Sequence, residues 1–394
     1  MRIVHVTSYQ IPGFGYEELY LARAQKALGH EVTIVTSNYL HPQGSYAVLS
    51  QRFAQRQIDA CEEESDGVRI VRLDSREIAG RVWLRGLERR IAQIRPDVVH
   101  CHNVLQFHTV RLALVNAMGR HSFALLVDEH TQISIIRKSR GGRLFYQFYG
   151  IVAQPLIGRY VAHYSAKNEG SKWFMETACR IRKPIEIITL GVDVDGFVAS
   201  TERRRDWRLF AGVPQDALLF LYTGKLIPAK GIDLLIRAAT KLLRDGISIH
   251  VALVGDAESR YLETMRALVS QAGLENRFHF LPSVPHGELP SVYAAADVAV
   301  WPRQETIAVL EALSTSLPVI INSSNGYAPI VERGAGLVFD ADDESSLAHA
   351  MLSLAEPSRR QAMGAVGRDV VCGSYSWRQC AERYLDAYQR ALQP

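Results

Sequence analysis

Two lysines five residues apart, Lys225 and Lys230, lie in the segment Gly224-Lys-Leu-Ile-Pro-Ala-Lys-Gly231. An apolar run typical of a buried strand precedes this segment, and a helix-like pattern over 232–243 follows it. Open parallel sheets bind ligands at the carboxyl ends of their strands. Two ammonium groups at such an edge suit a diphosphate, whose charge they would stabilise as it departs. Taken alone, the segment is explained better as two solvated lysines in a surface turn.

A carboxylate and a helix start follow a later strand. The chain continues there as Pro302-Arg-Gln-Glu-Thr-Ile-Ala-Val-Leu-Glu-Ala-Leu313, for which we predict a helix over 305–314. Its amino end, with Thr306 and Ile307, would face the same sheet edge, where the helix dipole favours an anion. Glu311 lies two turns into this helix and could accept hydrogen bonds from both hydroxyls of a ribose.

A glycine-containing loop, Gln10-Ile-Pro-Gly-Phe-Gly-Tyr-Glu-Glu18, follows the first strand-like run and leads into a predicted helix over 17–28. Gly13 and Gly15 would let the backbone approach a ligand closely, and amides at the helix start could hold an anion. A turn that needs positive φ explains these glycines equally well.

Strand-like apolar runs alternate with helix-like segments along the whole chain. Such alternation is typical of parallel sheets covered by helices on both faces, and it predicts an α/β protein with two doubly wound units. The expected strands cover residues 3–7, 31–36, 68–73, 98–101, 124–127, 160–164 and 185–189 in the first half, and 218–223, 249–254, 278–281, 298–301, 319–322 and 336–339 in the second.

The boundary between the two units is expected near residues 190–215, where we see no sustained periodicity of either kind. This gives a first domain over 1–195 and a second over 196–375. The last stretch, 376–392, has apolar residues at helical spacing and predicts an amphipathic helix. A return of this helix to the first domain is one option.

Composition indicates a globular protein. The chain has 394 residues, a formal charge of +4 and 47% hydrophobic residues, which argues against disordered and fibrous classes. We see no secretory signal and no apolar run long enough to cross a membrane. Five scattered cysteines without a C-x-x-C pair favour a reducing, cytoplasmic setting and speak against a zinc site.

The positive charge is concentrated in the first half, where residues 1–200 hold 25 basic and 19 acidic side chains. Arg81, Arg85 and Arg89 are spaced four apart on a predicted helix, and the segment 135–160 mixes arginines with Phe and Tyr. Solvated faces of ordinary helices are the preferred interpretation, and peripheral contact with anionic lipid headgroups is the main alternative. Nucleic-acid binding is not expected, because no recognised motif accompanies the charge.

The order of the motifs resembles the GT-B fold glycosyltransferases and, within them, the retaining family 4 enzymes that use nucleotide sugars. The resemblance extends over nearly the whole chain and implies two Rossmann-like domains facing across a cleft, with the acceptor on the first and the donor on the second. Besides the early glycine loop, its segments are Gly29-His-Glu-Val-Thr-Ile-Val-Thr36, Pro96-Asp-Val-Val-His-Cys-His102, Val127-Asp-Glu-His-Thr131, Leu190-Gly-Val-Asp-Val-Asp-Gly-Phe197, Gly224 to Gly231, Val254-Gly-Asp256 and Glu311-Ala-Leu.

The resemblance implies roles for the charged residues of the second half. Lys230 matches the diphosphate-binding lysine of the family, and Lys225 stands where an arginine usually works with it. Glu311 matches the second Glu of the E-x7-E signature, which contacts the ribose. Arg303 occupies the position of the first Glu, so the sequence departs from the family there, but the position is still expected to contact the donor. Glu305 is the nearest carboxylate and is the candidate for the catalytic role.

Other positions are also implied by the resemblance alone. His130 falls where the family keeps a histidine close to the donor sugar and the acceptor. Asn325 and Gly326 align with a loop that approaches the donor sugar, and Val284 aligns with the base pocket. The diphosphate needs no metal or other cofactor in that fold.

The resemblance therefore implies transfer of a hexose from a nucleoside diphosphate sugar, with a UDP-sugar favoured over a GDP-sugar, and with retention at the anomeric carbon. The acceptor is expected to be carbohydrate or lipid-linked, as in the synthesis of a polysaccharide precursor. Two alternatives stay open: a UDP-amino-sugar 2-epimerase of the same fold, and a catalytically weak nucleotide-binding scaffold for a partner enzyme.

Overall fold

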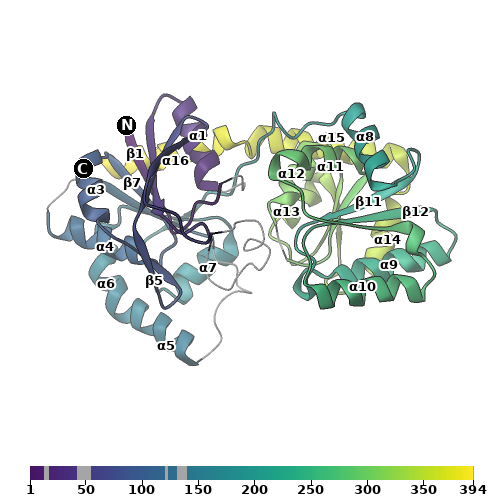
Figure 1. Ribbon diagram of the computed structural model, residues 1–394, viewed down its shortest axis with the longest axis horizontal. Coiled ribbons are helices and arrows are strands. Elements are labelled where there is room, and N and C mark those ends of the chain that lie inside the picture. The colour runs from purple at the N-terminus through teal and green to yellow at the C-terminus, as the bar shows by residue number, and fades with distance from the viewer. Residues whose placement is uncertain (13–16, 42–54, 120–122, 131–139, 305, 394) are drawn as a thin grey trace. The chain divides into compact units, whose positions relative to one another are not determined.

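The computed structural model describes residues 1–12, 17–41, 55–119, 123–130, 140–304 and 306–393. The chain divides into two compact units, each built around its own parallel sheet (Figure 1). Unit 1 comprises Met1–Gly191 together with Trp377–Pro394, and unit 2 comprises Val192–Ser376. The predicted α/β class with two parallel-sheet domains is confirmed.

The sheet of unit 1 has the strand order β10-β9-β8-β7-β1-β2-β4-β3, and only β3 runs antiparallel to its neighbour. Buried aliphatic runs form its central strands, as expected for a sheet covered on both faces. The strands are β1 (Arg2–Val6), β2 (Glu31–Ser37), β3 (Glu62–Ser65), β4 (Val68–Leu73), β7 (Val98–His102), β8 (Ala124–Glu129), β9 (His163–Ala166) and β10 (Ile185–Ile187).

The helices of unit 1 cover both faces of this sheet. A short hairpin, β5 (Ser75–Ile78) with β6 (Arg81–Leu84), accompanies them. The helices are α1 (Glu17–Ala27), α3 (Leu87–Ile94), α4 (Phe107–Ala117), α5 (Arg140–Phe148), a π-helical turn (Tyr149–Ala153), α6 (Gln154–Ile157), a 3-10 turn (Gly158–Tyr160), α7 (Glu169–Thr177) and α16 (Trp377–Leu392).

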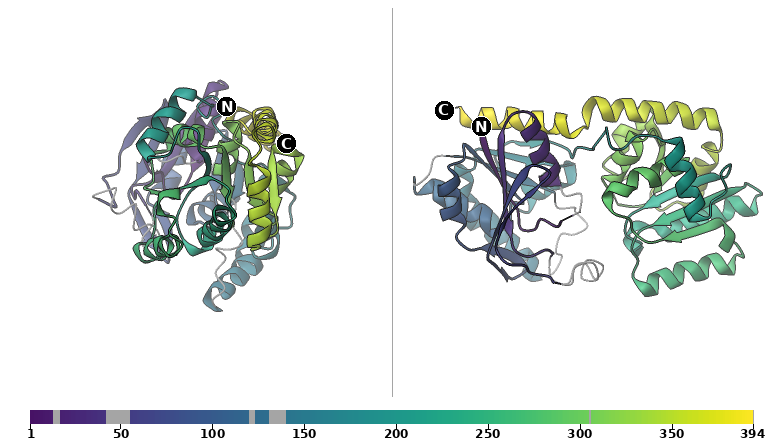
Figure 2. Two further views of the ribbon diagram at one scale, coloured as in Figure 1. Left: turned by 90° about the vertical axis from the view of Figure 1, so that its right-hand side faces the viewer. Right: turned by 45° about the horizontal axis from the view of Figure 1, so that its top comes forward.

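The C-terminal helix α16 packs into unit 1, where it lies beside the N-terminal strands (Figure 2). Its buried residues Ala381, Tyr384 and Tyr388 join a hydrophobic cluster with α1 and the sheet. Trp377 at its start stacks on Tyr20 of α1 with ring centroids 5.6 Å apart. Residues more than 350 positions away in the sequence from α1 therefore complete the core on that face.

Unit 2 contains a six-stranded, wholly parallel sheet in the order β13-β12-β11-β14-β15-β16. These strands confirm the predicted runs of the second half. They are β11 (Leu218–Thr223), β12 (Ile249–Val254), β13 (Phe278–Leu281), β14 (Val298–Trp301), β15 (Val319–Asn322) and β16 (Gly336–Phe339).

Helices on both faces of the second sheet complete unit 2. Short 3-10 or π turns lie at Pro228–Lys230, Glu275–Arg277, His286–Glu288 and Val331–Ala335. The α-helices are α8 (Thr201–Ala211), α9 (Ile232–Arg244), α10 (Ser259–Gln271), α11 (Leu289–Ala295), α12 (Ala308–Ser314), α13 (Ala328–Ile330), α14 (Glu344–Ser353) and α15 (Pro357–Ser374).

Two local predictions were wrong. The segment 201–211 is helix α8, which Ser200 caps by accepting a hydrogen bond from the Arg203 amide at 3.2 Å. The sequence shows no amphipathic period here, because the helix is mostly polar. Trp207 and Ala211 are its buried apolar residues. Arg81 lies on strand β6 while Arg89 lies on α3, so the spaced arginines share no helix face.

No helix within the described residues combines the length and the apolar character needed to cross a membrane.

Candidate functional site

The lysine-bearing turn of unit 2 begins where β11 ends and finishes at the start of α9. Gly224 has φ of 134° and Gly231 has φ of 74°, conformations that glycine adopts without strain. A Cβ on the neighbouring Gly255 would collide with the carbonyl of Gly224, so the two backbones approach closely. Lys225 is exposed and Lys230 is half-buried at this edge of the sheet.

Backbone hydrogen bonds fix the shape of this turn. The Leu226 amide donates to the Asp256 carbonyl at 2.9 Å, and the Lys230 amide donates to the Ile227 carbonyl at 2.9 Å. The Tyr222 hydroxyl donates to the Lys225 carbonyl at 3.0 Å. Both lysines are therefore attached to a braced backbone at the carboxyl end of β11, where a parallel sheet binds ligands.

Glu311 is buried and already receives two hydrogen bonds. His286 Nε2 lies 2.8 Å from its Oε1, and the Tyr293 hydroxyl donates to its Oε2 at 3.0 Å. The Tyr293 oxygen also lies 3.0 Å from Thr223 Oγ1 at the end of β11. Burial, and then the Glu311 carboxylate, raises the pKa of Tyr293 well above its ordinary value. This network joins α12, α11 and β11, and contact of Glu311 with a ribose stays a prediction.

His286 and Tyr293 are residues that the sequence did not identify. His286 lies two residues after Val284, which is half-buried in the segment expected to contact the base. The histidine therefore links that segment to Glu311. Its position in the sequence could have identified it as a site residue, because it follows strand β13 at the same sheet edge as the lysine turn.

Helix α12 begins later than predicted, at Ala308, with Ile307 as its N-cap residue. Thr306 precedes the cap, and its Oγ1 accepts from the Ala308 amide at 3.4 Å. A helix starting at residue 305 was therefore wrong by three positions. Glu305, like Gly13 and Gly15, lies outside the described residues.

Arg303 reaches back to the lysine turn. Its Nη1 donates to the Pro228 carbonyl at 3.0 Å and lies 3.7 Å from Asp233, while its Nε lies 2.5 Å from Asp342. The hydrogen bond that Arg303 donates to Asp342 raises the pKa of the guanidinium. Arg303 thus ties the turn to α9 and to the segment after β16, and its predicted contact with the donor stays a prediction.

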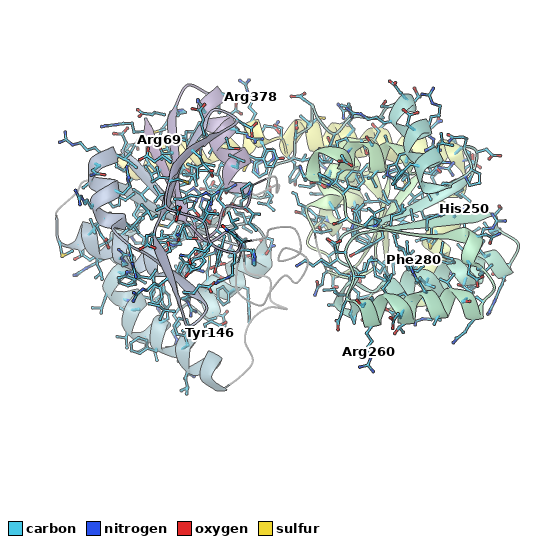
Figure 3. The ribbon with its side chains drawn as sticks, viewed as in Figure 1. Arg69, Tyr146, His250, Arg260, Phe280 and Arg378 are labelled. Carbon is cyan, nitrogen blue, oxygen red and sulfur yellow. The ribbon has the colours of Figure 1, made fainter. Side chains whose placement is uncertain are left out.

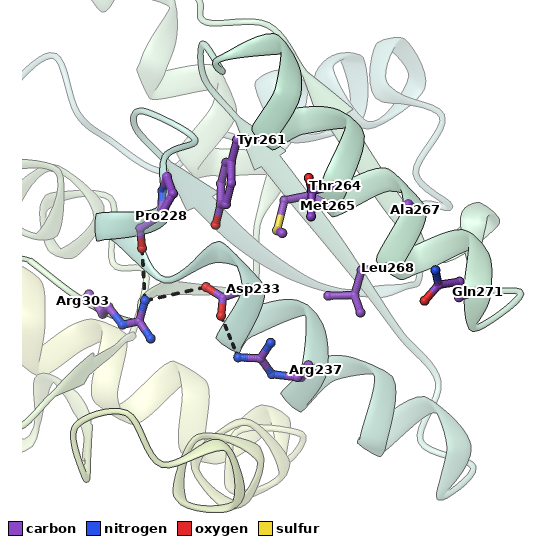
Figure 4. A pocket seen from close by; sticks show the side chains of 10 residues that line it. All are labelled: Pro228, Asp233, Arg237, Tyr261, Thr264, Met265, Ala267, Leu268, Gln271 and Arg303. Atoms are coloured by element: carbon purple, nitrogen blue, oxygen red, sulfur yellow. Dashed lines mark hydrogen bonds and ion pairs between the residues drawn. The ribbon is translucent and has the colours of Figure 1, made fainter.

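A cavity of about 480 Å³ adjoins Arg303 on the side of α9 and α10 (Figure 4). Pro228 and Arg303 form its end next to the lysine turn, and Asp233 lies between Arg303 and Arg237. Tyr261 and Leu268 of α10 form part of the opposite wall.

The loop after β15 contains the remaining predicted donor contacts. Asn325 is buried, and its Oδ1 accepts from the Tyr327 amide at 3.0 Å. Its Nδ2 has no hydrogen-bond partner among the described residues, while Gly326 next to it is exposed. The side-chain Nδ2 of Asn322 donates to the Pro302 carbonyl at 2.9 Å and so holds this loop beside the end of β14.

In unit 1 the predicted sugar-contacting residue, His130, follows β8 directly and is exposed. Its amide donates to Glu129 Oε1 at 3.0 Å, and the other oxygen of Glu129 accepts from the Val104 amide at 3.1 Å. The buried Glu129 carboxylate therefore fixes the backbone at His130 and leaves the imidazole at the surface.

Beneath this edge lies a buried ion cluster that sequence reasoning missed. Lys167 Nζ is 2.6 Å from Glu17 Oε1, 3.0 Å from Asp128 Oδ2 and 2.7 Å from the Tyr384 hydroxyl. Burial lowers the pKa of Lys167, but the carboxylates of Asp128 and Glu17 outweigh it and hold the pKa well above its ordinary value. Burial raises the pKa of Glu17.

Three buried histidines extend this cluster. His102 Nδ1 is 2.9 Å from Asp128 Oδ2, and its Nε2 is 3.0 Å from His5 Nδ1. His5 Nε2 is 2.8 Å from Gln25 Oε1, and His100 Nδ1 is 2.8 Å from the Tyr388 hydroxyl of α16. Burial lowers the pKa of His100 to about 4. Burial alone would lower the pKa of His102 as well, but the adjacent Asp128 raises it.

Two sets of these side chains have the composition of a metal site. Ligand atoms of His5, His100 and His102 lie within 4.8 Å of one another, as do those of Glu17, His102 and Asp128. Either set could hold a metal ion by distance. However, most of the ring nitrogens already face hydrogen-bond partners, so the structure gives no reason to route the chemistry through a metal, and metal independence stays a prediction.

Comparison with known proteins bears on both units. The sequence profile described as Glycosyl transferases group 1 matches residues 203–370, and that described as Glycosyltransferase Family 4 matches residues 19–195. The crystal structure of a glycosyltransferase from Rickettsia africae superposes with a TM-score of 0.74 at 15% identity, covering 100% of this chain and 98% of that one.

The chain belongs to the family 4-like GT-B glycosyltransferases. Among curated relatives, a GDP-mannose-dependent alpha-(1-6)-phosphatidylinositol monomannoside mannosyltransferase of Mycolicibacterium smegmatis is 32% identical over 51% of this chain and 55% of its own length. A D-inositol 3-phosphate glycosyltransferase of Kineococcus radiotolerans is 31% identical over 53% of this chain and 52% of its own. The matches thus span about half the length of these curated relatives.

Proposed function

We propose that this GT-B protein transfers a hexose from a nucleoside diphosphate sugar to an acceptor, with retention at the anomeric carbon. The observation that carries the proposal is the braced turn of Lys225 and Lys230 at the carboxyl end of β11, in the same unit as the buried Glu311 network. Cations held on a fixed backbone stabilise charge that develops on a departing diphosphate.

The named relatives change the order of the two donor classes that we propose. The preference for a UDP-sugar rested on the frequency of such donors in similar families, whereas the mannosyltransferase relative is GDP-mannose-dependent. We therefore place a GDP-sugar first and a UDP-sugar second. The side chains near Val284 and His286 are where the two bases would be distinguished.

For the acceptor, we propose a lipid-linked or polyhydroxylated carbohydrate. The mannosyltransferase relative acts on a phosphatidylinositol mannoside and the other named relative on an inositol phosphate. Unit 1 presents the exposed His130 at the carboxyl end of its sheet, where an acceptor hydroxyl could be hydrogen-bonded. We further propose a cytoplasmic setting at the inner face of a membrane, consistent with the cysteines all being free in the described structure.

A donor screen followed by product analysis tests this function. Thermal unfolding is measured with UDP, GDP, ADP and their common sugars, since a ligand that binds only the folded state raises its apparent stability. The responding sugar nucleotide is then incubated with and without candidate acceptors. Free nucleoside diphosphate that appears only with an acceptor, in the presence of EDTA, supports a metal-independent transferase.

Two outcomes would replace the proposal. Interconverted sugar nucleotides without release of nucleoside diphosphate would indicate an epimerase. Nucleotide binding with no turnover across a broad panel of donors and acceptors would indicate a scaffold, a reading that Arg303 at the position of the first Glu keeps open.

A further inference from the structure

One helical segment of unit 1 exposes apolar side chains along its outer side. Helix α5, the π-helical turn and α6 follow one another without a break over residues 140–157. Leu144 is 65% exposed, Phe148 61%, Ile151 55%, Val152 43% and Leu156 60%. We call these five residues the apolar ridge. Helices of globular proteins usually present polar residues on the outer side, so this ridge needs an explanation.

The opposite side of the same segment is anchored in unit 1. Tyr149 is buried and its hydroxyl donates to the Val104 carbonyl at 3.3 Å. Ile157 is buried, and Tyr146, labelled in Figure 3, packs edge-on against Phe174 of α7 with centroids 5.7 Å apart. The core side is therefore satisfied by other residues, and the ridge is not needed for folding of the unit.

Basic residues lie beside the helical segment that carries the ridge. The side chain of Arg180 lies against Gly150, because a Cβ there would come within 2.9 Å of Arg180 Cγ. Lys183 Nζ donates to the Val161 carbonyl at 2.6 Å and thus lies next to Arg159 at the end of the segment. Arg159, Arg180, Arg182 and Lys183 are all exposed.

The segment that carries the ridge contains no acidic residue, although Glu169 and Glu176 lie on the adjacent helix α7. Residues 131–168 contain neither Asp nor Glu, and neither do residues 178–184. An apolar helical face on a segment whose charged residues are all basic has the composition of a segment that lies in the headgroup region of a bilayer. Each cation near an anionic surface adds an attraction of about 1 kcal/mol.

We propose that the apolar ridge and the cations beside its segment dock unit 1 on an anionic lipid surface. Figure 1 shows α5 projecting from the sheet of its unit. The apolar side chains enter the headgroup and acyl boundary while the cations contact lipid phosphates. The proposal concerns unit 1 alone and does not depend on the donor chemistry of unit 2.

Flotation with vesicles tests the proposal without any sugar nucleotide. The full chain is mixed with vesicles of phosphatidylcholine alone, or of phosphatidylcholine with phosphatidylglycerol, at low and high salt. The wild-type protein should bind the anionic vesicles, and its binding should weaken as the salt concentration rises. A fraction should stay bound at high salt, because salt screens the attraction between charges but not the insertion of apolar side chains. The double variant Phe148→Ser with Leu156→Ser should bind at least tenfold more weakly, since each side chain loses its apolar transfer.

A matched control is available in unit 2, where Leu209 and Phe210 of α8 are exposed at 79% and 74%. Leu209→Ser with Phe210→Ser removes more exposed apolar surface than the ridge variant does, because both side chains are more exposed, and it should leave vesicle binding unchanged. Arg180→Gln with Arg182→Gln should lower binding at low salt while leaving most of the salt-resistant fraction in place. Unchanged thermal unfolding of each variant shows that it is folded.

Three outcomes would overturn the proposal: no binding of wild type to anionic vesicles, equal loss in the ridge and control variants, or a dimer of wild type that the ridge variant converts to a monomer. The last would identify the ridge as a self-association surface. Nucleotide-induced stabilisation, measured on the same samples, shows separately whether the donor function holds.

Discussion

The two units differ in the environment of the lysines that follow their parallel strands: in unit 2 these lysines are at least partly exposed, and in unit 1 the lysine is buried. In unit 2, Lys225 is exposed and Lys230 half-buried on a turn that ends a strand. In unit 1, Lys167 also follows a strand, but it is buried between Glu17 and Asp128. A charge near water can bind an anion with little reorganisation, whereas a buried charge must be paired to be tolerated.

A position at the carboxyl end of a strand does not by itself make a lysine accessible to a ligand. Both sheets have polar residues there, yet Lys225 and Lys230 of unit 2 are at least partly exposed to solvent, while Lys167 of unit 1 is buried. The cluster in unit 1 instead joins four strands to α1 and α16 through hydrogen bonds. We therefore expect substitutions in the buried cluster of unit 1 to act mainly on stability and substitutions in the lysine turn of unit 2 mainly on turnover.

The largest effect should come from Lys167→Met. This change leaves the buried carboxylates of Glu17 and Asp128 without their cation and should lower the free energy of unfolding by roughly 3–5 kcal/mol. Urea unfolding measures the loss, and amide hydrogen exchange assigns it to unit 1. Lys172→Met on α7, where the side chain is half-exposed, is the control. A loss of less than about 1 kcal/mol would mean that the cluster is not stabilising.

Lys230→Ala should lower kcat by about a hundredfold, equivalent to about 2.7 kcal/mol, because it removes positive charge from the departing diphosphate. The folding free energy should barely change. Lys241→Ala, an exposed lysine on the following helix α9, should leave kcat unaltered. Turnover of Lys230→Ala near that of wild type would remove this lysine from the mechanism.

Glu311→Ala should weaken nucleotide binding by roughly tenfold or more, the value of a hydrogen bond to a charged group. The expectation depends on a ribose hydroxyl sharing the carboxylate with His286 and Tyr293. Glu311→Gln, which keeps an acceptor for Tyr293, separates loss of ribose contact from collapse of this network. Calorimetric titration with GDP and UDP gives the affinities, and equal affinity of wild type and Glu311→Ala would argue against a ribose contact.

Acid should destabilise unit 1 through its buried histidines. Burial lowers the pKa of His108 to about 3, so between about 6.5 and 3 the unfolded chain binds a proton that the folded one does not. The contribution of neutral His108 to the free energy of unfolding is therefore fully present above pH 6.5 and is lost as the pH falls toward about 3. His108→Gln should flatten the dependence by up to about 1.4 kcal/mol per pH unit, measured by urea unfolding from pH 7 to 4.

The control for the acid prediction is the exposed histidine on α14, through His349→Gln. If this variant and His108→Gln change the slope equally, burial of the unit 1 histidines is not the cause. The raised pKa of His102 opposes the effect of its neighbours, so the slope of the whole unit is smaller than the sum of its lowered groups.

The smallest effect is expected for Arg303→Glu, at about 1 kcal/mol of unfolding free energy because the ion pairs are partly exposed. The new carboxylate would face Asp233 and Asp342 and would release the Pro228 carbonyl. Turnover should fall as the lysine turn loosens. Arg237→Glu removes an ion pair with Asp233 without touching Pro228 and is the control. Higher or broader donor use by Arg303→Glu would show instead that the position faces the sugar.

Much of the fold could be predicted because buried parallel strands have a local signature. The run Ile249–Val254 is apolar apart from one histidine and is a fully buried strand, and the strands of the second half were predicted with the correct bounds. Helix α8 was missed since its partners are supplied by the rest of unit 2: Arg208 donates to the Ala295 carbonyl and to Asp297. A polar segment shows no amphipathic period when its burial depends on such contacts.

The sequence by itself determined the two-unit α/β architecture and the lysine turn, because strand hydrophobicity and glycine spacing act between near neighbours. Only the tertiary structure decided that Glu311 is held by His286 and Tyr293, that Arg303 braces the turn, and that Lys167 meets Glu17, Asp128 and Tyr384. Those groups come from segments far apart in the chain. Their burial and pairing arise when helices and strands pack, so no local pattern records them.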